Sequence, residues 1–386
     1  MRCPTVTENC IIENPVEKTA MTTRHPVAVL DDIYYRPVSL VDVFVCNITD
    51  KKKATKLIQS LKKEFPLPDL CHLKRIRAVK GAQGQGQDSP LQVILCDGSC
   101  DIDKVSVTIS ESQDYSTLTK PFKVKVPAKM PLTRQQYEES ILYWPVNFHE
   151  DKSITKALTN QVFNSEEIDR INSHMEEAIV MAKIAAESKQ LPLGAVVVDP
   201  VQNIVIAKGY DLRHGSHPLQ HAAMVAIDLV ARSQGGGMWP LQGYKDLYYK
   251  VADQSLESTA SVTCPVMTAN YEKTDKDKKC GQATNNDQYS SNTSDQYSSK
   301  SGQVKTGPYL CTGYDIYLTR EPCVMCAMAL VHSRIGRVFY GKSYPKEGAL
   351  GSKYKLHTQT GLNHHYLVFR DVQRTKCDQL YDTAVT

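Results

Sequence analysis

Apolar residues between positions 168 and 182 recur every three or four residues, the spacing of one face of a helix. They are Ile168, Ile171, Met175, Ala178, Ile179 and Ala182. In front of them, Asn164 and Glu167 have the spacing of a capping box, in which two residues satisfy each other's backbone N–H groups. The pattern predicts an amphipathic helix that begins just after Asn164.

Strand-like and helix-like patterns alternate after this helix. Residues 194–199 and 204–207 are short β-branched runs separated by a polar turn, which predicts a hairpin. The next expected elements are a helix from Pro218 through Leu229, a strand at 314–318, a helix with Pro322 at its first position and a strand at 337–340. The order αββαβαβ predicts the α/β class for this part of the chain.

The N-terminal part has a different pattern. Residues 40–45, 73–79 and 91–95 are strand candidates, and 51–64 predicts a helix. A second helix is expected within 102–118, where the hydrophobic period is not clean. These elements predict a smaller α+β domain with the βαββαβ order of a ferredoxin-like fold.

Composition divides the chain further. Residues 254–307 are rich in Ser, Thr, Asn, Asp, Gln and Lys, and cannot bury enough apolar surface to order themselves. Prolines between positions 121 and 151 mark a second boundary. The expected organisation is a flexible N-terminus at 1–35, a basic α+β domain at 36–130, a linker at 131–163, and an α/β domain at 164–386 with a disordered insertion at about 254–307.

The overall composition is that of a globular protein. The 386 residues carry a net charge of +4, which is too weak to identify an anionic partner by itself. No apolar run reaches the length of a signal peptide core or of a membrane span. The 12 cysteines are scattered and form no regular framework, so we expect an intracellular protein in a reducing compartment, without membrane contact.

Candidate chemistry is concentrated in three residues. Cys323 and Cys326 follow a proline and are spaced to place both thiols on one helical face, and His221 stands near the start of an upstream helix. Two thiolates and one imidazole suit Zn²⁺ and leave one tetrahedral position open. The alternatives are a redox-active Cys-x-x-Cys pair, or two buried structural thiols with an unrelated core histidine. The preceding proline, the preceding strand and the upstream histidine together favour zinc.

The residue two positions after His221 changes the interpretation. In the nucleobase deaminase signature His-x-Glu … Pro-Cys-x-x-Cys, the glutamate moves protons between zinc-bound hydroxide and the base. This chain has Ala223 at that position. Alanine holds no proton, so the sequence predicts a metal site that has lost its catalyst.

Several segments carry a family resemblance. Residues 218–231 and 309–341 resemble the tRNA adenosine deaminases that convert the wobble adenosine to inosine, and more closely their catalytically degenerate subunits. Residues 348–351 and 361–364 resemble the C-terminal segments of the same family. The resemblance extends from about His149 to the end of the chain, apart from the polar insertion.

The resemblance implies a cytidine-deaminase-like three-layer fold and assigns roles to residues. His221, Cys323 and Cys326 take the zinc-ligand positions, and Ala223 takes the position of the proton-shuttling glutamate. Asp211 stands where active members carry an asparagine that contacts the substrate. Both departures imply that this chain does not turn over substrate.

Basic residues of the N-terminal part are candidates for phosphate contact. The candidates are Lys74, Arg75, Arg77, Lys80, Lys123 and Lys125. A strand period would place Arg75 and Arg77 on one face, where they could bind nucleic-acid phosphates. The alternative is that charge runs such as 51–63 are solvated helix faces. The resemblance implies that this region helps to present tRNA.

The expected function is a zinc-binding, non-catalytic subunit that forms a heterodimer with an active tRNA adenosine deaminase and supports tRNA binding and wobble editing. The expected location is the cytoplasm and the nucleus. One alternative is a nucleoside or tRNA deaminase active by itself, with Asp211 or a tail residue as the proton shuttle. Another is a tRNA-binding module in which zinc is purely structural.

Overall fold

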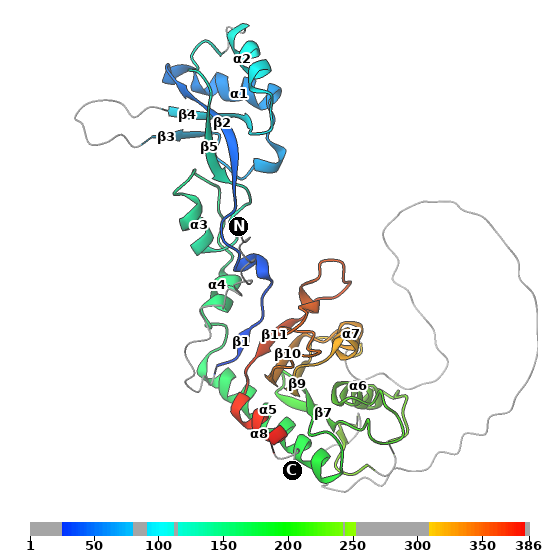
Figure 1. Ribbon diagram of the computed structural model, residues 1–386. Coiled ribbons are helices and arrows are strands. Elements are labelled where there is room, and N and C mark those ends of the chain that lie inside the picture. The colour runs from blue at the N-terminus through cyan, green and yellow to red at the C-terminus, as the bar shows by residue number, and fades with distance from the viewer. Residues whose placement is uncertain (1–24, 80–90, 112–114, 242–243, 252–308, 383–386) are drawn as a thin grey trace, which may run out of the picture. The chain divides into compact units, whose positions relative to one another are not determined.

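The computed structural model describes residues 25–79, 91–111, 115–241, 244–251 and 309–382. It divides into two compact units (Figure 1). The first contains residues up to Asn172 with Ala349–Gly361 and Leu367–Val372, and the second contains Ser173–Gly348, Leu362–Tyr366 and the chain from Gln373. The insertion expected at 254–307 lies outside the described residues.

A four-stranded antiparallel sheet organises the N-terminal part of the first unit. In spatial order its strands are β3 (Ile76–Ala78), β4 (Leu91–Asp97), β2 (Leu40–Ile48) and β5 (Phe122–Pro127), and its helices are α1 (Ala54–Glu64) and α2 (Ile102–Glu111). The chain order βαββαβ with this strand order is the ferredoxin-like arrangement, as the sequence predicted.

Side-chain alternation along β2 gives this sheet two covered faces. Phe44 and Cys46 pack under α1 and α2, together with Leu57 and Leu61 of α1. The intervening residues face the other side, where Trp144 is fully buried against the sheet. The period-2 pattern of a strand therefore supplies two separate cores from one element.

Arg75 ties α1 to this sheet from inside the unit. Its Nη2 donates to the backbone oxygens of Leu61 at 3.3 Å, Phe65 at 2.8 Å and Leu95 at 2.6 Å. The first two carbonyls lie at the C-terminal end of α1, where the Leu61 oxygen also accepts the N–H of the C-cap residue Phe65 at 2.9 Å. Burial lowers the pKa of Arg75 to about 10, which leaves the guanidinium charged at neutral pH.

The second unit is built on strands in the order β10 (Arg337–Lys342), β9 (Asp315–Arg320), β6 (Gly194–Asp199), β7 (Ile204–Tyr210) and β8 (Tyr248–Tyr249). β9 and β10 are parallel, and the other neighbours are antiparallel. The helices that begin after Asn172 are α6 (Ala222–Ser233), α7 (Val324–His332) and α8 (Arg374–Asp382). The expected hairpin is formed by β6 and β7.

Glycines on opposite faces of the hairpin let helices approach both sides. A Cβ at Gly194 would lie 1.9 Å from the backbone oxygen of Ala178 in α5 (Ser165–Glu187). A Cβ at Gly209, which points to the other face, would lie 3.0 Å from Val225 in α6. Only glycine fits at position 194, directly against the α5 backbone. With α5 on one face of the hairpin and α6 on the other, this unit has the helix–sheet–helix layers expected from the sequence.

Helix starts are where the structure differs from the sequence prediction. α5 begins as expected, because Asn164 and Glu167 form the reciprocal capping box with both bonds at 2.9 Å. The helix expected from Pro218 begins only at Ala222, and the one expected from Pro322 begins at Val324. Both are preceded by an extended residue, which the hydrophobic pattern alone cannot distinguish from a first helical turn.

Other short elements were not predicted. The expected linker at 131–163 contains α3 (Arg134–Ser140) and α4 (Lys152–Leu158), capped by the side chains of Thr133 and Asp151. β1 (Val27–Ala28) pairs antiparallel with β11 (Leu367–Arg370). Short 3-10 turns occur at Asp32–Tyr34, Lys51–Lys53, Pro68–Leu70 and Leu356–Thr358.

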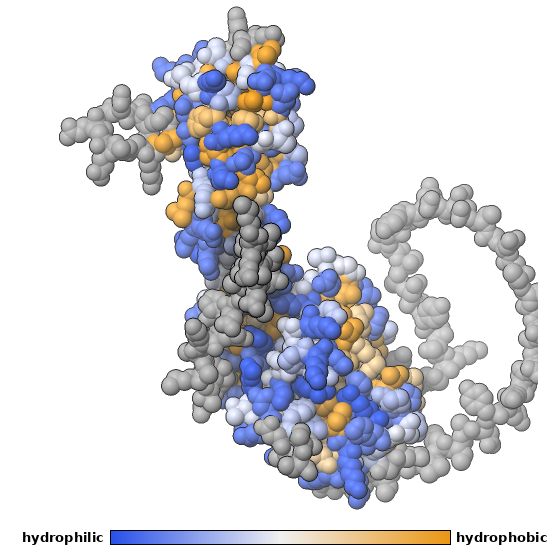
Figure 2. Space-filling model, in the orientation of Figure 1, coloured by the Kyte–Doolittle hydropathy of each residue, from blue (hydrophilic) through white to orange (hydrophobic). Residues whose placement is uncertain are grey.

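The hydropathy of the surface and of the described helices bears on whether the chain crosses a membrane. Hydrophilic and apolar residues are interspersed on the face shown in Figure 2. Among the described residues, no helix is both long and apolar enough to cross a membrane.

A buried histidine joins α5 to the β6–β7 hairpin. His174 lies 2.9 Å from the side-chain oxygen of Asn203 and 3.7 Å from the Glu177 carboxylate, which also pairs with Lys208. Burial lowers the pKa of His174, but the contacts with Glu177 and Asn203 outweigh it, so the net pKa is raised. The folded protein therefore favours the protonated imidazole.

We expect replacement of Arg75 by methionine to lower the free energy of unfolding by about 2 kcal/mol, because three buried carbonyls lose a charged donor. Urea unfolding followed by tryptophan fluorescence measures this. The exposed neighbour provides the control, since Lys74→Met should change stability little. Equal stability of the two variants would show that Arg75 does not hold α1.

Replacement of His174 by glutamine should make stability less dependent on pH. A raised folded pKa means that the stabilisation is complete below the unfolded pKa of about 6.5 and is lost as the pH rises through the folded value. The wild-type free energy of unfolding should therefore fall from about pH 6 to about pH 9 more steeply than that of His174→Gln. Parallel curves over this range would contradict the assignment.

Candidate metal centre

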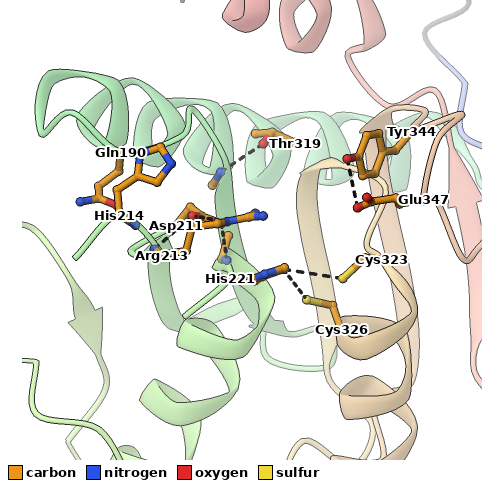
Figure 3. A network of polar contacts seen from close by, with 12 residues as sticks. Gln190, Asp211, Arg213, His214, His221, Thr319, Cys323, Cys326, Tyr344 and Glu347 are labelled. Atoms are coloured by element: carbon orange, nitrogen blue, oxygen red, sulfur yellow. Dashed lines mark hydrogen bonds and ion pairs between the residues drawn. The ribbon is translucent and has the colours of Figure 1, made fainter. Parts of the chain in front are cut away.

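His221, Cys323 and Cys326 meet at the starts of two helices. His221 is the N-cap residue of α6, Cys323 is the N-cap residue of α7, and Cys326 lies in the first turn of α7. The His221 Nδ1 atom is 3.6 Å from Sγ of Cys323 and 3.5 Å from Sγ of Cys326 (Figure 3). The three donor atoms lie within 4.8 Å of one another. In the described part of the chain, this is the one such group of metal-binding donors.

Both N-cap residues have extended backbones and form no side-chain cap of their own helix. Their side chains are free to point toward the space between the helices. The unpaired N–H groups and the positive end of each helix dipole lie on this side, so negative charge is favoured there. The local backbone thus suits two thiolates around a cation.

The pKa values of the two thiols shift in opposite directions. The pKa of Cys323 is lowered to about 3, chiefly because its sulfur accepts a hydrogen bond from Cys326, with a further contribution from His221. The pKa of Cys326 is raised well above its ordinary value by the same bond and by burial. A divalent cation would replace the proton of Cys326 and stabilise both thiolates. Two sulfurs and one imidazole nitrogen are a donor set that fits Zn²⁺ with one open position.

A pocket opens onto His221, Cys323 and Cys326. The other lining side chains that could take part in proton transfer, or that occupy the expected position of the proton shuttle, are those of Asp211, Arg213, Ala223, Glu321, Tyr344 and Glu347. Ala223 is 4% exposed and contributes only a methyl group to the pocket wall. Ala223 lies two residues after His221, and its side chain has no group that can donate or accept a proton.

Asp211, which the sequence analysis named as an alternative proton shuttle, does not present a free carboxylate to the pocket. It is fully buried, and both oxygens accept hydrogen bonds from Arg213, from Nε at 2.8 Å and from Nη2 at 2.7 Å. Its oxygens also accept the backbone N–H groups of Arg213 and Ala222, each at 3.3 Å. A carboxylate with these partners has no lone pair left for proton transfer, which weakens its candidacy as a replacement shuttle.

Sequence reasoning missed two other carboxylates in this pocket. Glu321 is 2% exposed and accepts the backbone N–H of Tyr344 at 2.9 Å, while Glu347 accepts the Tyr344 hydroxyl at 3.1 Å. A Cβ at Gly348 would lie 2.3 Å from the Glu321 carboxyl group, so a side chain at position 348 would displace this carboxylate. The position of Glu321 directly before Pro322 and Cys323 was a signal that could have identified it.

The described members of the predicted phosphate-binding set do not lie on one surface. Arg75 is buried against backbone carbonyls, and Arg77 donates to the Gln92 side chain and to the Tyr143 backbone oxygen while stacking on Trp144. The structure thus gives both arginines roles inside the fold that a strand period could not reveal. Lys80 lies outside the described residues.

The remaining lysines are exposed at two separate edges. Lys74 precedes edge strand β3, whereas Lys123 and Lys125 lie on β5, the opposite edge of the four-stranded sheet. Two strands separate these edges, a distance of roughly 14 Å at ordinary strand spacing. The Lys125 ammonium is only loosely paired, 3.8 Å from Asp42. Phosphate contact by the three lysines stays a prediction.

Comparison with known proteins identifies the family. Residues 41–144 match the family described as "tRNA-specific adenosine deaminase TAD3 N-terminal domain", and residues 168–342 match "Cytidine and deoxycytidylate deaminase zinc-binding region". The chain is 38% identical to the "Probable inactive tRNA-specific adenosine deaminase-like protein 3" of Mus musculus, over 89% of this chain and 88% of that protein.

More distant relatives match over similar lengths. The "tRNA-specific adenosine deaminase TAD3" of Arabidopsis thaliana is 30% identical, over 82% of this chain and 88% of the relative. The "tRNA-specific adenosine deaminase subunit tad3" of Schizosaccharomyces pombe is 28% identical, over 81% of this chain and 77% of the relative. Both matched regions and the full-length similarity lead to one conclusion: the chain belongs to the family of tRNA-specific adenosine deaminase-like protein 3.

Proposed function

We propose that this chain is a zinc-binding, non-catalytic subunit of a tRNA adenosine deaminase, which pairs with an active subunit as a heterodimer and supports tRNA binding for wobble editing. One observation carries the proposal: His221, Cys323 and Cys326 converge on a single point, while Ala223 stands beside them where the chemistry needs a carboxylate. The names of the relatives, which describe an inactive protein and a subunit, support it.

The chemistry explains why the chain needs a partner. Zinc, when bound, supplies hydroxide at neutral pH. Attack on an adenine amino carbon also requires protonation of the ring nitrogen and of the departing amine. Ala223 can do neither, Asp211 is held by Arg213, and Glu321 holds the Tyr344 backbone. We therefore assign the proton transfers to the partner subunit.

The N-terminal part of the first unit is the proposed contribution to tRNA binding. Exposed Lys74, Lys123 and Lys125 provide positive charge on a rigid sheet. Lysine at such positions contacts phosphates without reading sequence, which suits a subunit that holds tRNA for another active site. None of the described cysteines forms a disulfide, in keeping with our proposal of an intracellular protein that works in the cytoplasm and the nucleus.

The decisive experiment compares the purified chain, its purified partner and the reconstituted pair in a tRNA deamination assay. We expect turnover by the pair alone. Turnover by this chain alone, abolished by His221→Ala, would show that it is an enzyme with another proton shuttle. Full activity of the partner alone would instead leave this chain as a separate tRNA-binding module.

Charge reversal of the exposed lysines tests tRNA contact. The variant carrying Lys74→Glu, Lys123→Glu and Lys125→Glu should weaken tRNA binding by the complex, and the slope of log affinity against log salt should fall by roughly one per lost contact. Arg75 and Arg77 are left unchanged because they stabilise the fold. The matched control reverses three other lysines, Lys104, Lys152 and Lys156, which are exposed on helices of the same unit. If the Lys74/Lys123/Lys125 variant and the control variant both keep the wild-type affinity for tRNA and the wild-type salt slope, these lysines do not contact tRNA.

A further inference from the structure

The start of α6 has no side-chain cap from its own N-cap residue. An N-cap residue ordinarily accepts a backbone N–H of the first turn with its side chain, and loss of such a cap destabilises a helix by about 1 kcal/mol. His221 occupies the N-cap position, but its ring faces the two cysteines and caps nothing. A ring turned toward the two cysteines cannot also cap α6.

Asp211 supplies the missing acceptor from outside the helix. It follows the last residue of β7, and its Oδ2 accepts the N–H of Ala222, the first residue of α6, at 3.3 Å. Its own backbone N–H donates to the oxygen of Leu193 at 2.9 Å, which fixes Asp211 against the sheet. The peptide that donates this bond is the one that links His221 to Ala222, so the bond restrains the direction in which the His221 ring leaves the backbone.

Arg213 makes this arrangement electrostatically possible. A fully buried carboxylate without a counter-charge is strongly unfavourable, and the guanidinium of Arg213 pairs with it through two parallel bonds. The pair supplies an acceptor to α6 without adding net charge beside the thiolates. An amide at position 211 could not do the same, because one of its two ends would be an N–H donor facing another donor.

We propose that Asp211 and Arg213 are positioning residues of the metal centre, which hold the start of α6 so that His221 Nδ1 points at the two cysteine sulfurs. This inference rests on the proposed zinc site and deepens it. Residues that orient a metal ligand through its neighbours commonly change metal affinity 10- to 100-fold when they are replaced. The pair is then part of what makes the site bind metal, although neither residue contacts the ion.

The test measures zinc affinity of the full-length chain by competition with a chromophoric chelator. We expect Asp211→Asn to bind zinc roughly 10- to 100-fold more weakly than the wild type. The cobalt-loaded variant should also show altered d–d absorption bands, because a rotated imidazole changes the geometry around the metal. A purely structural role would lower thermal stability without moving this spectrum.

The chain contains a matched control. Asp315 is 1% exposed and pairs with Arg337 through the same two-bond fork, at 2.8 and 2.6 Å, but it lies at the start of β9 and contacts no ligand residue. Asp315→Asn should reduce stability and leave both zinc affinity, within about twofold, and the cobalt spectrum unchanged. If Asp211→Asn fails to fold, Arg213→Lys replaces it, since lysine keeps the charge and loses the fork.

The outcomes separate the inference from the function on which it rests. A folded wild-type chain that binds no zinc would overturn the metal site itself. A wild-type chain that binds zinc, with variants at Asp211 or Arg213 that bind it within about twofold, would overturn only the positioning role. An equal loss of zinc affinity in Asp315→Asn would do the same, because any buried ion pair would then have that effect.

Discussion

The convergence of two helix N-termini is the constraint on which the second unit depends. α6 leaves β7 and α7 leaves β9, and β6 lies between these strands, so the two helix starts can meet only if both helices pack closely on the sheet. Gly209 permits that approach for α6. The positive ends of the helices then create an environment that favours paired thiolates.

Local features of the fold could be predicted from the sequence because their causes are local. The capping box at Asn164 and the β6–β7 hairpin follow from spacing and turn residues within a few positions. The pairing of β1 with β11 joins Val27 to Arg370, and no short-range pattern encodes such a contact. The late starts of α6 and α7 were missed because a ligand residue in an extended conformation has the same neighbours in sequence as a residue in the first turn.

In the candidate site, too, features with local causes could be predicted and features that depend on distant contacts could not. Its donor residues could be identified from type and spacing, and the absence of the glutamate was visible at Ala223. The role of Arg213 could not be identified, since an arginine two residues after an aspartate is common on any surface. Arg75 illustrates the reverse error, because a basic residue in a strand-like run suggests a solvent-facing charge, whereas burial and the end of α1 decide its actual role. Tertiary contacts select among roles that the residue type leaves open.

The separation of the ligands along the chain gives the metal a second physical effect. His221 and Cys323 are 102 residues apart, so an ion that bound both would close a long loop for as long as it stayed bound. The entropy of loop closure grows only with the logarithm of length, and doubling such a loop changes it by about 0.6 kcal/mol. A chain cross-linked in this way tolerates large changes in the length of the segment between its ligands. The long polar insertion in the sequence lies between His221 and Cys323. The weak dependence of loop-closure entropy on loop length allows an insertion of this size.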